Sequence, residues 1–205
     1  RKSEMTKMKV FATPSSANFA VKLAMHLNAD FYSTDSVGLY PDGQVYVQIS
    51  ERINNDDVVI VGNTQGSRQF EELCLLIHTI RRQNAKRVIV VIPYFGAGRQ
   101  DRAKKEGDDV LAKMHASILS SLGPDWILMM DLHNEGIRHF FDNSVRPREL
   151  YLESLFVKVI ESLCLKDFVF VSDVGGILNW VRSYAEKFGV DAATLDQRRE
   201  GPAQK

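Results

Sequence analysis

Four short polar segments carry the side chains that could do chemistry. Each follows an apolar run: Arg99-Gln-Asp101, Asp131-Leu-His133, Asp173-Val-Gly-Gly176 and Asp196-Gln-Arg-Arg199. Guanidinium groups match the oxygens of a phosphate, and carboxylates hold hard cations such as Mg²⁺. Glycines let backbone amides come close to a phosphate. Together the four segments indicate a site for a magnesium-bound nucleotide.

Structural roles compete with this interpretation at single residues. His133 could be a buried ring bonded to a backbone carbonyl, and Asp173 could cap the helix after it. Tyr40 and Tyr46 could stack on a base or could be exposed strand aromatics. The Arg198-Arg199 pair could be solvated. The remaining histidines lie on predicted helices without a partner pattern and are expected to be structural: His26, His78, His115 and His139.

The segment 88–92 must position the first of these groups. Its continuous run of apolar, mainly β-branched residues predicts a buried central strand of a parallel sheet, which Pro93 ends. Gly96, Gly98 and Arg99 follow. In open α/β sheets, ligands bind at the carboxyl ends of the strands, so Arg99 is expected at a binding edge.

Strands and helices alternate along nearly the whole chain. Strands are predicted over 8–12, 58–61, 88–92, 126–130, 168–171 and 190–195, and helices over 15–27, 73–82, 111–122, 152–163 and 177–188. Ser15-Ser16 is a predicted helix cap. The turn at Asp42-Gly43 followed by an alternating segment 44–50 predicts a hairpin. This order predicts an α/β fold with a mainly parallel sheet. Strand–loop–helix units recur on both sides of Pro147, so two similar lobes are predicted, residues 1–147 and 148–205.

Composition narrows the class of protein. The chain has 205 residues, of which 44% are hydrophobic, and its formal net charge is zero, which gives no support for a nucleic-acid or anionic-membrane partner. No apolar run approaches the ~20 residues of a membrane span. Cys74 and Cys164 are isolated, which favours a reducing, cytoplasmic compartment and gives no zinc signature. The glycine-rich signatures of P-loop kinases and nicotinamide-binding folds are missing, as is the Gly-x-Ser-x-Gly turn of serine hydrolases.

Several longer strings resemble the ribose-phosphate pyrophosphokinase family, also called phosphoribosyl pyrophosphate synthetases. The similarity runs from about Val10 to Arg199 and includes Tyr40-Pro-Asp-Gly-Gln44, Val91-Ile-Pro-Tyr-Phe-Gly-Ala-Gly-Arg-Gln-Asp-Arg102, Met130-Asp-Leu-His133, Phe140-Phe-Asp142 and Ser172-Asp-Val-Gly-Gly176. The resemblance implies two phosphoribosyltransferase-like lobes, with the second incomplete. Only the amino-terminal two thirds of such an enzyme is expected here, since both ends resemble cut edges of a longer protein.

The resemblance also implies an activity, a cofactor and partners. Such enzymes transfer the β,γ-diphosphoryl group of Mg-ATP to the C1 hydroxyl of ribose 5-phosphate and release AMP. Arg99, Gln100 and Asp101 match the ATP-contacting segment. His133 and Asp173 match magnesium-site residues, and Arg199 matches an arginine of the catalytic loop. A further segment, which reaches the adenine site of a neighbouring subunit, implies a homo-oligomer, either a dimer or a hexamer built from dimers; its matching residues are Tyr40, Asp42, Gly43 and Gln44.

Two departures from the family pattern leave an alternative open. Gln197 stands where the family has a catalytic lysine, and loss of one such contact typically costs ~10²–10³ in rate. The loop that holds ribose 5-phosphate is absent, so these 205 residues alone are expected to be inactive. The alternative is a non-catalytic or weakly active homologue that binds nucleotide and regulates or scaffolds an active synthetase. The missing loop also argues against a stand-alone phosphoribosyltransferase.

Overall fold

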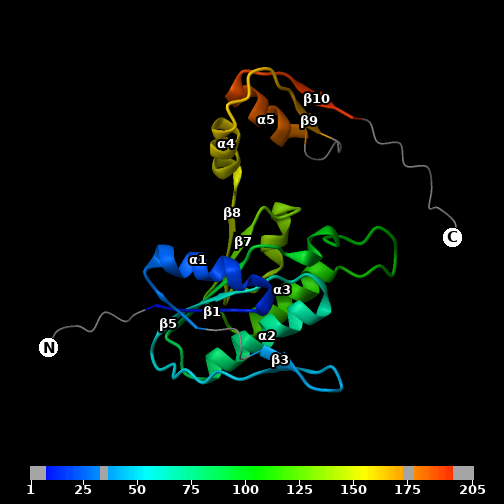
Figure 1. The fold of residues 1–205 in the computed structure, drawn as a ribbon. Coiled ribbons are helices and arrows are strands. Elements are labelled where there is room, and N and C mark those ends of the chain that lie inside the picture. The colour runs from blue at the N-terminus through cyan, green and yellow to red at the C-terminus, as the bar shows by residue number, and fades with distance from the viewer. Residues whose placement is uncertain (1–7, 33–36, 173–177, 196–205) are drawn as a thin grey trace. The chain divides into compact units, whose positions relative to one another are not determined.

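The chain forms two compact units. The computed structural model describes residues 8–32, 37–172 and 178–195. The first unit ends at Tyr151 and the second begins at Leu152 (Figure 1). Within the described residues, no helix is long and apolar enough to cross a membrane.

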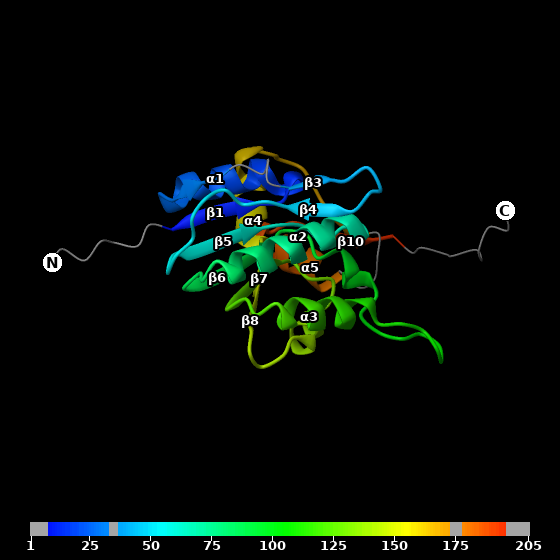
Figure 2. The ribbon, with the colours of Figure 1, turned by 90° about the horizontal axis from the view of Figure 1, so that it is seen from below.

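The first unit is built on a six-stranded parallel sheet in the order β2-β1-β5-β6-β7-β8. Figure 2 shows β1, β5, β6, β7 and β8 side by side. The strands are β1 (Lys9–Ala12), β2 (Asp30–Phe31), β5 (Asp57–Val61), β6 (Arg87–Ile92), β7 (Trp126–Met130) and β8 (Arg146–Leu150). The parallel strand predicted at 88–92 is confirmed as β6, which lies between β5 and β7.

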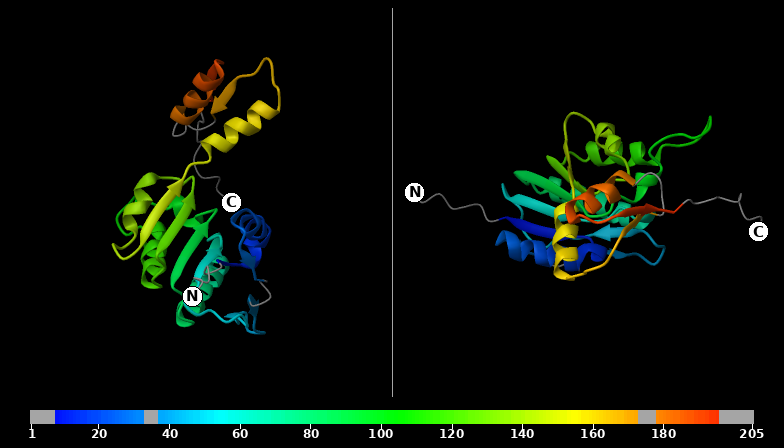
Figure 3. Two further views of the ribbon diagram at one scale, coloured as in Figure 1. Left: turned by 90° about the vertical axis from the view of Figure 1, so that its left-hand side faces the viewer. Right: turned by 90° about the horizontal axis from the view of Figure 1, so that it is seen from above.

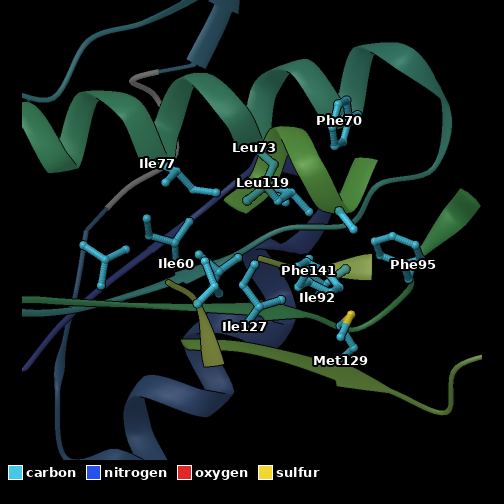
Figure 4. Close-up of a cluster of buried hydrophobic side chains, with 14 of the residues drawn as sticks. Ile60, Phe70, Leu73, Ile77, Ile92, Phe95, Leu119, Ile127, Met129 and Phe141 are labelled. Carbon is cyan, nitrogen blue, oxygen red and sulfur yellow. The ribbon is translucent and has the colours of Figure 1, made fainter. Parts of the chain in front are cut away.

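Helices cover both faces of this sheet. The helices are α1 (Ala17–Leu27), α2 (Gly66–Arg82) and α3 (Leu111–Ser121). In β5, Val58 and Ile60 pack in one core with α2 and α3, while Val59 and Val61 pack in another core with α1. Because strand side chains alternate between faces, an unbroken apolar strand can serve two cores. Figure 4 shows the larger core, with side chains from α2 and α3 above those of the strands.

The predicted hairpin is present as β3 (Val37–Leu39) and β4 (Val45–Val47), which pair antiparallel. Its turn is closed by the Tyr40 amide, which donates to the Gln44 carbonyl at 2.9 Å. The predicted cap at Ser15-Ser16 is confirmed only in position. Both serines belong to a 3₁₀ turn over Pro14–Ser16, and Ser16 occupies the N-cap position of α1, but its side chain makes no capping bond.

The boundary between the units falls four residues later than predicted. Residue 147 lies inside β8, whose register pairs Ile127 with Pro147. Proline cannot donate to a ladder, but β8 is an edge strand, where proline is tolerated. The proline at the predicted lobe boundary is therefore part of the first unit's sheet.

The second unit is smaller and contains α4 (Glu153–Ser162), β9 (Phe170–Ser172), α5 (Leu178–Phe188) and β10 (Ala192–Thr194). Figure 3 shows α4 in yellow and α5 in orange. β9 and β10 overlap the strands predicted at 168–171 and 190–195, although both are shorter than expected, and they pair in parallel. Phe168, Phe170 and Phe188 pack ring against ring, with centroids 5.4–5.8 Å apart. Glu153 ties the two helices together by accepting hydrogen bonds from Ser183 and Lys187.

Candidate functional site

A pocket of about 180 Å³ lies at the carboxyl ends of β6 and β7. Its lining combines two aromatic side chains, a guanidinium group, a carboxylate and an imidazole. The lining residues are Tyr94, Phe95, Arg99, Met130, Asp131, Leu132 and His133. Two residues predicted from different strand ends, Arg99 and His133, therefore share one pocket.

The loop after β6 is held against the loop after β5. The Gly96 amide donates to Thr64 Oγ1 at 2.8 Å, and the Thr64 amide donates to the Tyr94 carbonyl at 3.1 Å. A Cβ atom on Gly96 would lie 2.4 Å from the Thr64 carbonyl oxygen, so only glycine fits this approach. The two bonds fix where the following 3₁₀ helix, η3 (Gly96–Arg99), begins.

Arg99 ends η3 with its side chain at the pocket. No residue in the described part of the chain gives its guanidinium group a hydrogen bond or an ion pair. Its five donors are therefore available to a ligand, and their planar fork matches the oxygens of a phosphate.

His133 faces η3 across the pocket. A Cβ atom on Gly98 would lie 3.3 Å from the Cβ of His133, so the two loops are already in close contact. The His133 side chain is exposed and makes no hydrogen bond to a described residue. This environment differs from the alternative of a buried ring bonded to a carbonyl, and it leaves the imidazole able to meet a ligand.

The loop after β7 has a constrained backbone. Asp131 has a φ of +39°, in the left-handed region that Asp adopts more readily than most residues. Its amide donates to the Leu150 carbonyl at 3.2 Å. The next amide, that of Leu132, donates to Glu149 Oε1 at 2.8 Å. The sequence analysis does not single out Glu149, because it places the boundary between the two lobes at Pro147, two residues earlier.

Gln100 and Asp101 lie beside the pocket rather than in its lining. The Gln100 carbonyl accepts a bond of 3.1 Å from the Ala112 amide near the start of α3. Asp101 Oδ2 accepts a bond of 2.6 Å from Asn134 Nδ2, and Asn134 Oδ1 accepts one of 2.8 Å from the Gly136 amide. Asn134, which the sequence did not single out, thus connects the loops after β6 and β7.

The predicted site residues of the hairpin are not brought to this pocket. The Tyr40 ring packs against Tyr46 with centroids 4.9 Å apart, and Asp42 Oδ1 accepts a bond from the Gln44 amide at 3.1 Å. Gly43 has a φ of +89°, as the hairpin turn requires. None of these residues lines the pocket. Asp173, Gln197 and Arg199 lie outside the described residues.

The pocket suits a metal ion that arrives with a nucleotide. Across residues 8–32, 37–172 and 178–195, no group of three His, Cys, Asp or Glu side chains could hold a metal by itself. Asp131 and His133 nevertheless supply two donors in one pocket. Mg²⁺ keeps several waters and is usually held by one or two carboxylates together with the phosphates of its substrate, so this donor set fits Mg-nucleotide.

Neither cysteine offers a competing nucleophile in the pocket. Both are free thiols. Burial, with the nearby charge of Glu71, raises the pKa of the Cys74 thiol to about 12. A thiol with that pKa is almost fully protonated near neutral pH and is a poor nucleophile.

The chain is similar in sequence to proteins of one family. A family model described as the N-terminal domain of ribose phosphate pyrophosphokinase matches residues 8–123. The chain is 34% identical over 202 residues to a ribose-phosphate pyrophosphokinase of Helicobacter pylori, covering 97% of this chain and 62% of that protein. It is 36% identical over 197 residues to one of Granulibacter bethesdensis, covering 94% and 62%. The chain thus spans less than two thirds of these relatives.

Similarity to a solved structure supports the same fold. The crystal structure of phosphoribosylpyrophosphate synthetase from Mycobacterium smegmatis matches with a TM-score of 0.85 and 23% identity, covering 95% of this chain and 65% of that one. This agreement confirms the predicted α/β class with a mainly parallel sheet. The strand-end motifs, the pocket they form and the match of residues 8–123 lead to one assignment: the chain belongs to the ribose-phosphate pyrophosphokinase family.

Proposed function

We propose that the full-length protein transfers the diphosphoryl group of Mg-ATP to the C1 hydroxyl of ribose 5-phosphate in the cytoplasm. The products are phosphoribosyl pyrophosphate and AMP. The observation that carries the proposal is the shared pocket of Arg99, Asp131 and His133, in which the guanidinium group has no partner among the described residues.

The reaction would use these residues as follows. The C1 oxygen attacks the β-phosphorus, the bond from that phosphorus to the α-phosphate oxygen breaks, and AMP leaves with the electron pair. The proton of the C1 hydroxyl passes to solvent. Arg99 binds phosphate oxygens, and Gln100 and Asp101 hold the nucleotide beside it. Asp131, His133 and Asp173 would hold Mg²⁺, which when bound neutralises charge on the β- and γ-phosphates.

The hairpin and the carboxyl-terminal segment complete the proposed site. Tyr40, Asp42, Gly43 and Gln44 form an exposed hairpin tip, which supports a role at the adenine site of a second subunit in a homo-oligomer. Arg199 would stabilise charge that develops during transfer. Gln197 can donate a hydrogen bond there but supplies no charge.

The test is the cofactor and substrate dependence of AMP release by the full-length protein. We expect AMP only when ATP, Mg²⁺ and ribose 5-phosphate are all present. Arg99→Ala should weaken Mg-ATP binding roughly tenfold or more, because a charged hydrogen bond is lost. Arg82→Ala is the matched control, since this exposed arginine ends α2 at the amino edge of the sheet. AMP release that is independent of the sugar phosphate would contradict the proposal.

Gln197 favours a second candidate function, a nucleotide-binding homologue that regulates or scaffolds an active synthetase. Gln197→Lys separates the two. For an enzyme limited by the missing charge, this change raises the rate by up to roughly 10²-fold. A protein that binds Mg-ATP, stays inactive with the lysine and co-purifies with an active paralogue is the regulator.

A further inference from the structure

We infer that Glu149 is a positioning residue that fixes the Asp131–His133 loop, and through it the placement of the ligand-binding side chains opposite Arg99. The Glu149 carboxylate on β8 contacts the loop after β7, whose residues line the pocket. The inference rests on the proposed function, because it concerns how that pocket is held in shape.

Glu149 is unusually buried for a carboxylate. Its side chain is only 1% exposed, and Oε2 has no hydrogen-bond partner among the described residues. Burial alternates along β8, and Pro147 and Glu149 occupy its less exposed positions. An apolar side chain at such a position would avoid the desolvation that a carboxylate suffers there. A carboxylate at this position is therefore less favourable for folding than an apolar side chain. We infer that it has another role.

That role follows from the bond that the carboxylate makes. Glu149 Oε1 accepts from the Leu132 amide at 2.8 Å, and Leu132 lies between Asp131 and His133. The preceding amide, of Asp131, is bonded to the backbone of β8. Two consecutive amides thus donate hydrogen bonds to β8. The second bond is accepted by a side chain, so a substitution of Glu149 can remove it.

Because of the geometry of the loop, loss of the Leu132–Glu149 hydrogen bond would affect the pocket. Asp131 is held at a φ of +39°, a conformation that persists only where the surroundings favour it. On the other side, His133 already lies against Gly98 of η3. A change in the path of the loop would move Asp131 and His133 together, and it would alter their distance from Arg99.

Arg138 places a positive charge near the second oxygen of the carboxylate. Its Nε lies 3.7 Å from Glu149 Oε2 but donates its hydrogen bond to the Glu135 carbonyl at 3.3 Å, and its side chain is 34% exposed. A second ionic contact, of 3.6 Å, joins Arg138 to Glu135 Oε2. Glu149 Oε1 accepts from Leu132. Glu149 does not line the pocket, so it acts through the loop and not on the ligand.

The experiment compares two substitutions in the full-length protein. Glu149→Gln keeps an oxygen that can accept from Leu132, whereas Glu149→Met keeps the length of the side chain and removes the acceptor. Replacing a buried charge with an apolar side chain of similar volume often leaves stability unchanged. In either variant, the Arg138 guanidinium group remains in contact with water and with the Glu135 carboxylate. Both variants are therefore expected to fold. If Glu149→Met does not fold, the Gln variant and exchange of the Leu132 amide in the wild type still test the bond.

The control is Asp57→Leu. Asp57 is also a poorly exposed carboxylate, at 12%, and it accepts two hydrogen bonds from Arg87 at 2.9 and 2.7 Å. It begins β5, at the opposite edge of the sheet from the pocket. Its loss should lower the melting temperature and leave nucleotide binding unchanged.

The measurements are the Kd of Mg-ATP by calorimetry, the exchange rate of the Leu132 amide and the KM for Mg-ATP. Glu149→Met is expected to weaken binding about tenfold or more and to speed exchange at Leu132, because misplaced contact groups lose much of their effect. Glu149→Gln should stay within roughly threefold of the wild type for both.

The inference is overturned if Glu149→Met binds Mg-ATP like the wild type, or if Asp57→Leu weakens binding equally. It is also overturned if the Leu132 amide exchanges at the same rate in all variants. A wild type that binds Mg-ATP but releases no AMP with ribose 5-phosphate refutes the proposed function, while binding and exchange still decide the role of Glu149.

Discussion

Asn134 connects two loops of the candidate site through the two ends of its amide. Nδ2 donates to Asp101 at 2.6 Å, and Oδ1 caps the 3₁₀ helix η4 (Glu135–Phe140) by accepting from the Gly136 amide. Asn134→Asp should keep the cap, since Asp and Asn cap equally well. It replaces the donor to Asp101 with a second carboxylate, which repels Asp101. We expect a melting temperature near that of the wild type and a severalfold higher KM for Mg-ATP.

Asn134→Ala serves as the comparison, because it removes both bonds. It should lose about 1 kcal/mol of stability through the cap and raise KM less than Asn134→Asp does, since no repulsion is added. Thermal unfolding and steady-state kinetics of both variants measure the two effects separately. Equal KM values for the two variants would show that repulsion at Asp101 does not matter.

At the scale of single residues, the sequence predicted side chains that face a ligand and missed those that hold the backbone. Arg99 and His133 could be found because each lies in the loop after an apolar strand, and the carboxyl ends of parallel strands share one edge of the sheet. Glu149 and Asn134 could not, because each acts on an amide or a carboxylate of a loop elsewhere in the chain. No local pattern marks such long-range bonds.

At the scale of elements, periodicity predicted the central strands and the helices but not the outer strands of the sheet. The strands β1, β5, β6 and β7 and the three helices of the first unit overlap the predicted segments, whereas β2 and β8 were not predicted. Two further errors concern the cap and the lobe boundary. Ser15 and Ser16 form a 3₁₀ turn ahead of α1, and Pro147 lies in an edge strand, where its missing amide costs little. Both outcomes depend on tertiary neighbours, which a single segment does not reveal.

The contact between α2 and α3 is expected to make the stability of the first unit depend on pH. His115 of α3 is buried and stacks on Phe70 of α2, with ring centroids 3.7 Å apart. Its Nδ1 has no hydrogen-bond partner among the described residues. Burial lowers the pKa of His115 below its usual value, because the charged ring would lose its hydration.

The sign of the effect follows from linkage. The unfolded chain binds the proton at His115 more readily than the folded one. The stability that depends on a neutral His115 is fully present above the pKa of about 6.5 that histidine has in the unfolded chain. It is lost as the pH falls from there toward the lowered pKa of His115 in the folded chain. His115→Phe keeps the stacked ring and removes the proton site. The difference in unfolding free energy between pH 7.5 and 5.5 should be smaller in this variant than in the wild type.

Urea unfolding across that pH range measures the difference. His78→Gln is the control, since His78 lies on the exposed side of α2 and meets water in both states. It should leave the pH dependence unchanged. An identical pH dependence in wild type and His115→Phe would mean that His115 is not the group responsible.

At the scale of the whole molecule, the two units differ sharply in how much apolar surface they bury. Among the described residues, the buried apolar side chains all belong to the first unit except Ala185. No residue of α4 is buried, and three of its apolar side chains are exposed, as is Leu163 directly after it: Leu155, Phe156 and Val159. Burial of apolar surface is the main favourable term in folding, so stability should concentrate in the first unit.

We therefore predict that residues 8–151 fold when expressed alone and that residues 152–205 do not. The first fragment should unfold cooperatively in urea, with a free energy of unfolding in the ordinary range of about 5–15 kcal/mol. The second should lose its circular dichroism gradually, because its core lacks the buried side chains that make unfolding cooperative. Limited proteolysis of the 205-residue chain should give a resistant product that ends near Tyr151. A cooperative transition in the isolated 152–205 fragment would contradict this view, since it would require a core that the exposed side chains of α4 do not supply.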